Sequence, residues 1–237
     1  MPTAPTEVLD LLKPFTADAV MNGATTLIGA FLGAMLAFVF QIYLNYRQNR
    51  LTSLTSAHRI MFCLLQQINT LVLIQKDFIF PHLKDSGKFI SIPAVHEFDA
   101  TKHVFDFATF DFMLKNSKSR AVMYDLYFAQ ESYIEALTVL NARSKMHREE
   151  VQSKLAAAGI QNGGETTFGA IKGALGPYVY PSIVNSTDQL IDVLSGAFAK
   201  LVKSKAEFRS YAVKAFGTND FTEFDFPDTY GLTQPQK

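Results

Sequence analysis

Cysteine is nearly absent from this chain of 237 residues. Cys63 is the only one, so the chain has no intramolecular disulfide framework and no zinc site built from cysteines. The glycine-rich loop that binds phosphate, a histidine pair at i and i+4 for zinc, and the Gly-x-Ser-x-Gly nucleophile turn are missing as well. These absences exclude the enzyme and metalloprotein classes that such motifs mark, and we expect no cofactor and no metal.

Charge is absent from one long stretch of the sequence. Residues 19–46 contain 28 positions without a charged side chain, more than the ~20 apolar residues needed to cross a bilayer. Tyr43 and Tyr46 close the stretch and Arg47 follows, whereas residues 1–18 hold three acids and one lysine. The positive-inside rule then places the C-terminal side in the cytoplasm. A cleaved signal peptide would start with basic residues and have a shorter apolar core, so we predict a single retained transmembrane helix in the inner (cell) membrane.

The uncharged stretch has one distinctive face. Small and polar residues recur along it every three or four positions, at Asn22, Thr26, Gly29, Gly33, Ala37, Gln41 and Asn45. Small residues let helix backbones approach closely, and amides can hydrogen-bond between helices. Polar groups inside a membrane need protein or water partners, so we predict that copies of the chain associate. Two arrangements stay open: simple packing against another copy or another membrane protein, and a ring whose stripe faces a water-filled path.

Proline is absent from residues 17–80, and apolar residues keep helical spacing well beyond the uncharged stretch. We therefore predict one long helix that leaves the membrane and becomes the first helix of a cytoplasmic domain. A second span over residues 60–74 is the alternative. That segment is short and has polar residues at its centre, namely Gln66, Gln67 and Asn69.

Glycine and proline divide the remainder of the chain. Helices are predicted over residues 119–158, 165–175 and 181–216, with breaks at Gly159, at Asn162-Gly163-Gly164 and at Gly176-Pro177, and a stop at Gly217. Residues 81–104 are predicted to be irregular, although 89–92 could pair briefly as a strand. Four aromatic residues that follow are expected to anchor in the core, namely Phe105, Phe107, Phe110 and Phe112.

These predictions give an all-α fold class in four parts. Residues 1–18 form a short extracytoplasmic segment and residues 19–46 the transmembrane helix. Residues 47–217 form a cytoplasmic helical bundle, and residues 218–237 an acidic, aromatic tail that we expect to be loosely ordered.

One group of residues could carry chemistry. Arg143 and His147 are spaced i, i+4 on a predicted helix, with Asn141 beside them and Glu131 about three turns upstream. An arginine that binds phosphate and a histidine that moves a proton are what metal-free RNA cleavage needs. The alternative is a structural polar cluster, because Ser144 and His147 occupy positions where the apolar stripe of this helix calls for leucine.

On these residues the chain resembles a group of bacterial single-pass membrane proteins with the same plan. They share a small-residue-rich span, arginines at its exit, a long helix, and a later segment like Arg143–Gln152. More loosely, the chain is similar to small membrane effectors of prokaryotic antiviral defence that accompany RNA-targeting CRISPR systems. The resemblance implies a divergent HEPN-like helical domain and assembly into a ring or pore. HEPN ribonucleases separate their Arg and His by more residues than the three found here, so ribonuclease activity does not follow from the likeness.

Three functions stand as hypotheses. The first is a self-associating membrane effector, pore-forming or otherwise altering permeability, in defence against phage. The second is a membrane-tethered ribonuclease that uses Arg143 and His147. The third is a scaffold whose tail docks a cytoplasmic protein through Phe221, Phe224 and Phe226. The expected partners are the lipid bilayer and further copies of the chain, and a mild basic excess in residues 47–217 fits either nucleic acid or anionic lipid.

Overall fold

The computed structural model describes residues 17–114, 117–160 and 166–222. The chain divides into two compact units, residues 1–52 and 53–237, which are described in turn. Every regular element in the described ranges is a helix, and none of these residues forms a strand. The all-α prediction is confirmed.

Unit 1 contains the first part of helix α1 (Ala17–Ile74). This helix is uninterrupted, as the sequence predicts. Each described side chain in residues 20–52 is exposed. The helix contains a window long and apolar enough to cross a membrane, and none of that window is buried. An apolar surface of this extent needs lipid or protein to cover it.

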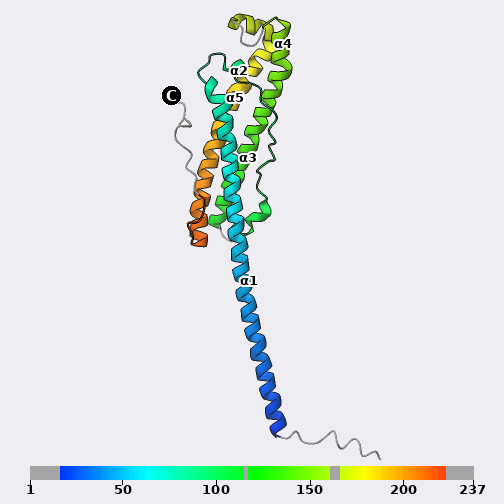
Figure 1. Cartoon of the computed structure of the whole chain (residues 1–237), viewed down its shortest axis with the longest axis vertical. Coiled ribbons are helices and arrows are strands. Elements are labelled where there is room, and N and C mark those ends of the chain that lie inside the picture. Colours follow the sequence, from blue (N-terminus) through cyan, green and yellow to red (C-terminus); the bar gives the residue numbers. More distant parts are fainter. Residues whose placement is uncertain (1–16, 115–116, 161–165, 223–237) are drawn as a thin grey trace, which may run out of the picture. The chain divides into compact units, whose positions relative to one another are not determined.

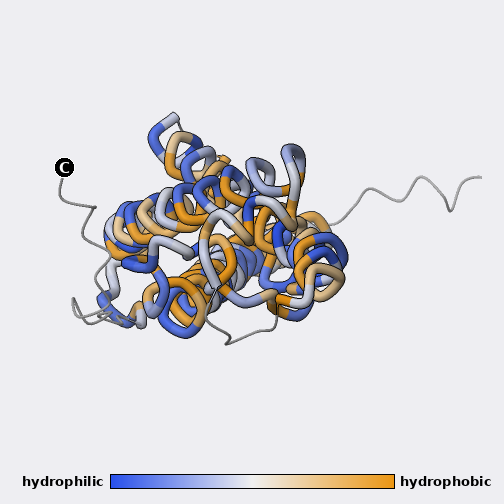
Figure 2. The backbone as a smooth tube through the Cα atoms, turned by 90° about the horizontal axis from the view of Figure 1, so that it is seen from above, coloured by the Kyte–Doolittle hydropathy of each residue, from blue (hydrophilic) through white to orange (hydrophobic). Residues whose placement is uncertain are grey.

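Unit 2 is built around three long helices: α1 from residue 53 onward, α3 (Ser117–Met146) and α5 (Phe168–Phe216). Figure 1 shows these three lying side by side along the unit. Figure 2 shows hydrophobic and hydrophilic positions alternating around the helices, as amphipathic helices in a bundle require. The chain continues from α3 through the π-helix η6 (His147–Val151) into α4 (Gln152–Ala157). The predicted helix over 119–158 is therefore confirmed to within two residues at its start and one at its end.

Helix α5 consists of two helices separated by a kink. Gly176 has φ 74° and ψ 179°, a backbone conformation that glycine adopts at little cost. Pro177 follows at the first position of the second helix, where its missing N–H is not needed. The predicted break at Gly176-Pro177 is confirmed, but the second helix starts at Pro177 and not near residue 181. Gly217, with φ 66°, ends α5 as predicted.

The first helix of α5 begins later than predicted. It starts at Phe168, and the Oγ1 of Thr167 accepts a hydrogen bond from the N–H of Ala170 as a cap. The expected start at Glu165 and the break at Asn162-Gly163-Gly164 lie outside the described residues.

Two short turns follow α1, namely the π-helix η3 (Gln75–Ile79) and the 3₁₀ helix η4 (Phe80–His82). Residues 88–106, which we call the connector, come after these turns and lead to the region before α3. The connector starts with α2 (Lys88–Ser91), has no regular structure from residue 93 onward, and leads into the 3₁₀ helix η5 (Phe107–Met113). The suggested strand at residues 89–92 is wrong, because the N–H of Ile92 bonds the carbonyl of Lys88 and closes a helical turn.

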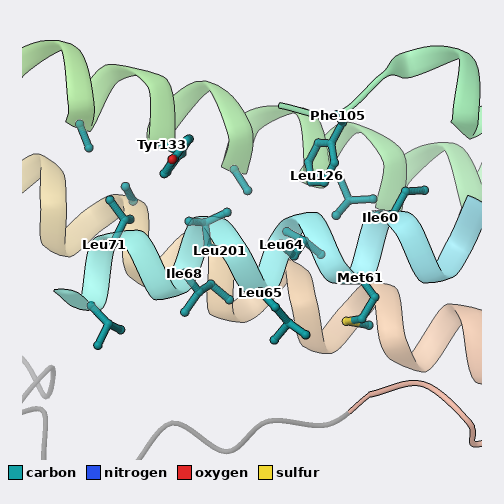
Figure 3. Packing of buried hydrophobic residues seen from close by; sticks show 14 of the residues in the cluster. Ile60, Met61, Leu64, Leu65, Ile68, Leu71, Phe105, Leu126, Tyr133 and Leu201 are labelled. Atoms are coloured by element: carbon teal, nitrogen blue, oxygen red, sulfur yellow. The ribbon is translucent and has the colours of Figure 1, made fainter. Parts of the chain in front are cut away.

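The main core lies between α1, α3 and α5. Figure 3 shows Ile60 of α1 close to Leu126 of α3 and to Phe105 of the connector. Met61, Leu65 and Ile68 lie on the other side of α1, toward α5. Each fully buried side chain of this size contributes roughly 1.5–3 kcal/mol to folding. A second cluster joins α2, η6, α4 and α5, and it consists of Phe89, Val151, Leu155, Leu175, Val179 and Ile183.

The aromatic anchors follow the prediction only in part. Phe105 and Phe110 are buried, Phe112 is half-buried, and Phe107 is exposed. Phe221, assigned above to a docking tail, is instead 3% exposed and stacks on the ring of His58 with centroids 4.7 Å apart. Its ring therefore belongs to the core and not to an exposed tail, while Phe224 and Phe226 lie outside the described residues.

Candidate functional site

The small and polar stripe of α1 lies on an uncovered helix surface. All seven stripe side chains are exposed: Asn22, Thr26, Gly29, Gly33, Ala37, Gln41 and Asn45. A Cβ atom placed on Gly29 or Gly33 would meet no other atom within 4 Å. The backbone at these two glycines is thus open to close approach by another helix.

The polar members of the stripe are partly bonded within the helix. Thr26 donates its hydroxyl to the carbonyl of Asn22 at 2.8 Å, which satisfies that hydroxyl without a partner molecule. Gln41 donates from Nε2 to Oδ1 of Asn45 at 3.1 Å, so these two amides share one face of α1. Each primary amide has two N–H donors and one oxygen acceptor. The pair therefore keeps bonding capacity for a second helix.

The spacing of the stripe also sets how a partner helix would cross. Most of its steps are of four residues, and rows at i±4 are inclined by about 26° to the helix axis. Two helices that pack along such rows of small residues cross with a right-handed angle of about 40°. In such a crossing, Gly29 and Gly33 would lie at the point of closest approach to the partner helix.

The second candidate group lies in unit 2, where Arg143 is 1% exposed. Its guanidinium donates from Nη1 to the carbonyl of Pro93 at 2.9 Å, and from Nη2 to the carbonyls of Phe89 at 3.0 Å and Ile92 at 2.6 Å. Nε donates to the hydroxyl of Thr187 at 3.4 Å. All three nitrogens of the guanidinium are therefore engaged. Burial lowers the pKa of Arg143 to about 10, so the side chain is still charged at neutral pH.

His147 lies one helical turn beyond Arg143 and bonds the same part of the connector. Its Nε2 is 3.3 Å from the carbonyl of Ile90, and because a carbonyl only accepts, Nε2 must carry the proton. Nδ1 is buried without a hydrogen-bond partner. Burial first, and then the nearby charge of Arg143, lower the pKa of His147 to about 4. His147 is therefore neutral at physiological pH.

Asn141 holds the connector further along. Its Nδ2 donates to the carbonyl of Phe98 at 2.7 Å, and its Oδ1 accepts from the N–H of Phe98 at 2.9 Å. Glu131 does not join this group: it is exposed, and twelve residues along a helix separate it from Arg143 by about 18 Å. Three of the four residues proposed from the sequence thus meet at the connector, and the fourth does not.

Several residues that were not predicted as site residues also hold the connector. Cys63 and Gln67 of α1 both donate to the carbonyl of His103 at 2.7 Å. Three residues of the helix formed by α3 and η6 act in the same way: Gln130 accepts from the N–H of Phe105, Ser144 accepts from the N–H of Val95, and Arg148 donates to the carbonyl of Val95. Their sequence signal was weak, since a polar residue on an apolar stripe indicates a buried hydrogen bond but not its partner.

The hydrogen bonds of Arg143 and His147 give both residues a structural role. They bond carbonyls that α2 leaves unpaired at its C-terminal end, together with carbonyls just beyond it. Arg143 could bind a phosphate only if the connector moved away, because its guanidinium nitrogens already donate to other groups. The described residues also contain no group of three His, Cys, Asp or Glu side chains that could hold a metal ion.

In comparison with known proteins, the chain matches no family model, no curated protein and no solved structure.

Proposed function

We propose that this chain is a membrane-anchored protein that assembles with copies of itself through the small and polar stripe of α1. The assembly alters the permeability of the inner membrane, and unit 2 faces the cytoplasm. The observation that carries the proposal is the uncovered apolar surface of α1, with two open glycines at its centre.

The helix itself supports a position in lipid. Its apolar window has no buried residue, whereas a core helix of a soluble protein of this length would bury most of one face. The first arginines after the window, Arg47 and Arg50, favour the cytoplasmic side for the residues that follow.

The stripe supports association between copies. In lipid there is no hydrophobic driving force between helices, so packing depends on close backbone contact and on hydrogen bonds between helices. Gly29, Gly33 and Ala37 allow close contact, and the Gln41–Asn45 amide pair has donors left for a neighbour. A role in antiviral defence rests on the resemblance to membrane effectors alone.

The proposal is tested with the full chain in lipid nanodiscs. Gly29→Leu together with Gly33→Leu fills the open stripe, and we expect the assembly to fall to monomers and any toxicity or ion leakage on expression to disappear. The matched control is Ala24→Leu, because nine residues place Ala24 half a turn around α1 from Gly33. Unchanged assembly in the double variant would overturn the proposal.

A further inference from the structure

An exposed aromatic face lies on the outside of unit 2. Four rings form it: Phe107 of η5 and Tyr124, Tyr127 and Phe128 of α3, which are 40–61% exposed. Phe107 and Tyr127 have centroids 5.5 Å apart, and Tyr127 and Phe128 5.7 Å, so these three rings are contiguous, and Tyr124 lies one helical turn before them on the same side of α3. Exposed clusters of this kind mark sites of association.

The charge around this aromatic face is mainly negative. Exposed carboxylates border it on both elements: Asp106 and Asp111 beside Phe107, and Glu131 and Glu135 one and two turns beyond Phe128. Arg120 lies on the same side of α3, and its Nη1 donates to the carbonyl of Leu114 at 3.1 Å. A surface that binds this face should therefore have small side chains, which leave room for the rings, and positive charge.

The second half of α5 presents such a surface, which we call the α5 face. Two lysines, each preceded by two small residues, follow its outer side at helical spacing, and all six are exposed: Gly196, Ala199, Lys203, Ala206, Ser210 and Lys214. A Cβ atom on Gly196 would meet nothing within 4 Å. Lys203 is 74% exposed and 3.8 Å from the carboxylate of Glu207. Small side chains between lysines leave room for protruding rings.

The two faces lie at the same height along the bundle. Ser204 of α5 donates its hydroxyl to the carbonyl of Asp125 at 3.2 Å, and Lys200 donates to the hydroxyl of Ser132 at 2.8 Å. These contacts put the centre of the α5 face level with the turns of α3 that carry Phe128.

We propose that the aromatic face of one copy binds the α5 face of the next. Because the two surfaces differ, the contact is heterologous, and such contacts close into a ring when the rotation between copies allows it. The inference rests on the proposed self-association and deepens it, since it names the surface that unit 2 contributes. Opposite charges on the two faces would fix which surfaces meet.

Cross-linking of the full chain tests this contact. Cys63 is first replaced by serine, and Phe128→Cys and Ala199→Cys are then introduced into separate chains that are co-expressed and oxidised in nanodiscs. We expect a disulfide-linked dimer from the mixture and none from either variant alone. With both cysteines in one chain we expect a ladder of multimers. Lys84→Cys with Lys172→Cys, at exposed positions outside both faces, is the control and should give no ladder.

Charge reversal gives an independent measurement. Lys203→Glu with Lys214→Glu should lower the cross-linking yield roughly tenfold, as should Glu131→Lys with Glu135→Lys, and combining all four should restore it. An assembly of undiminished mass that yields no mixed cross-link, or that links Phe128→Cys to itself, overturns this inference and leaves the proposed self-association standing. A chain that is monomeric in nanodiscs overturns both.

Discussion

Arg143 and His147, one helical turn apart, both bond carbonyls in α2 or directly after it. Arg143 reaches the carbonyl of Ile92 at 2.6 Å, and His147 that of Ile90 at 3.3 Å. The spacing that suggested a catalytic pair in the sequence therefore serves to fix the connector. The cost of burying a charge is offset here by carbonyl dipoles and not by a carboxylate.

Replacement of Arg143 should destabilise the fold. Arg143→Met leaves three carbonyls of the connector without their donor, and we expect the free energy of unfolding to fall by roughly 3 kcal/mol. Arg143→Lys should recover only part of this loss, because an ammonium cannot reproduce the planar fork of a guanidinium. Denaturant unfolding of the full chain in micelles measures both.

The matched control for Arg143 is Lys145→Met, at an exposed position on the same helix, which should change the free energy of unfolding by less than about 0.5 kcal/mol. The ribonuclease hypothesis predicts the opposite pattern for Arg143: a variant of normal stability that has lost RNA cleavage. Normal stability in Arg143→Met would contradict the structural role assigned to this residue.

The stability of unit 2 should depend on pH through His147. Its pKa is about 4 in the folded chain, compared with 6.5 for an unperturbed histidine. Between these values the unfolded chain binds a proton that the folded chain does not, so the free energy of unfolding falls as the pH is lowered from 6.5 towards 4. A shift of this size corresponds to about 3 kcal/mol over the full window.

The measurement compares denaturant unfolding at pH 7 and pH 4.5 in the wild type and in His147→Gln. The variant should lose less stability than the wild type over this range, because glutamine takes up no proton. His96→Gln, at an exposed position, is the control and should keep the wild-type dependence. Equal pH dependence in all three chains would show that His147 has no such effect.

Cys63 should be unreactive in the folded chain. Burial raises the pKa of its thiol to about 12, and the thiol donates to the carbonyl of His103. Since the thiolate is the nucleophile, a pKa three units above the ordinary value lowers its population about 1000-fold. Alkylation by iodoacetamide at pH 8 should therefore be slower by orders of magnitude than in urea-unfolded protein. Comparable rates would contradict the partial burial of this thiol and its hydrogen bond to His103.

The long helices could be predicted because their signals are local. Apolar residues at helical spacing indicated α1, α3 and α5, and the positive φ angles of Gly176 and Gly217 fall where glycine was expected to interrupt or end a helix. The kink in α5 was placed correctly for the same reason: a glycine followed by a proline ends one helix and can start another.

The connector could not be predicted in the same way. It has no repeating pattern, and the helix side chains that hydrogen-bond it belong to residues 25 to 57 positions away, such as Gln130 and His147. Ser144 and His147 were noticed as polar residues at leucine positions, but nothing in the sequence says which backbone groups they bond. The burial of Phe221 was missed for the same reason, because its partner His58 belongs to α1.

The most direct test of the account is the mass of the full chain in lipid nanodiscs, measured beside that of a chain that begins at Ser53. We predict a large assembly of defined size for the full chain and a much smaller species for the shortened one, since the stripe of α1 holds the copies together. A full chain that is monomeric in the bilayer, or a shortened chain that assembles equally well, would contradict the central role of the stripe.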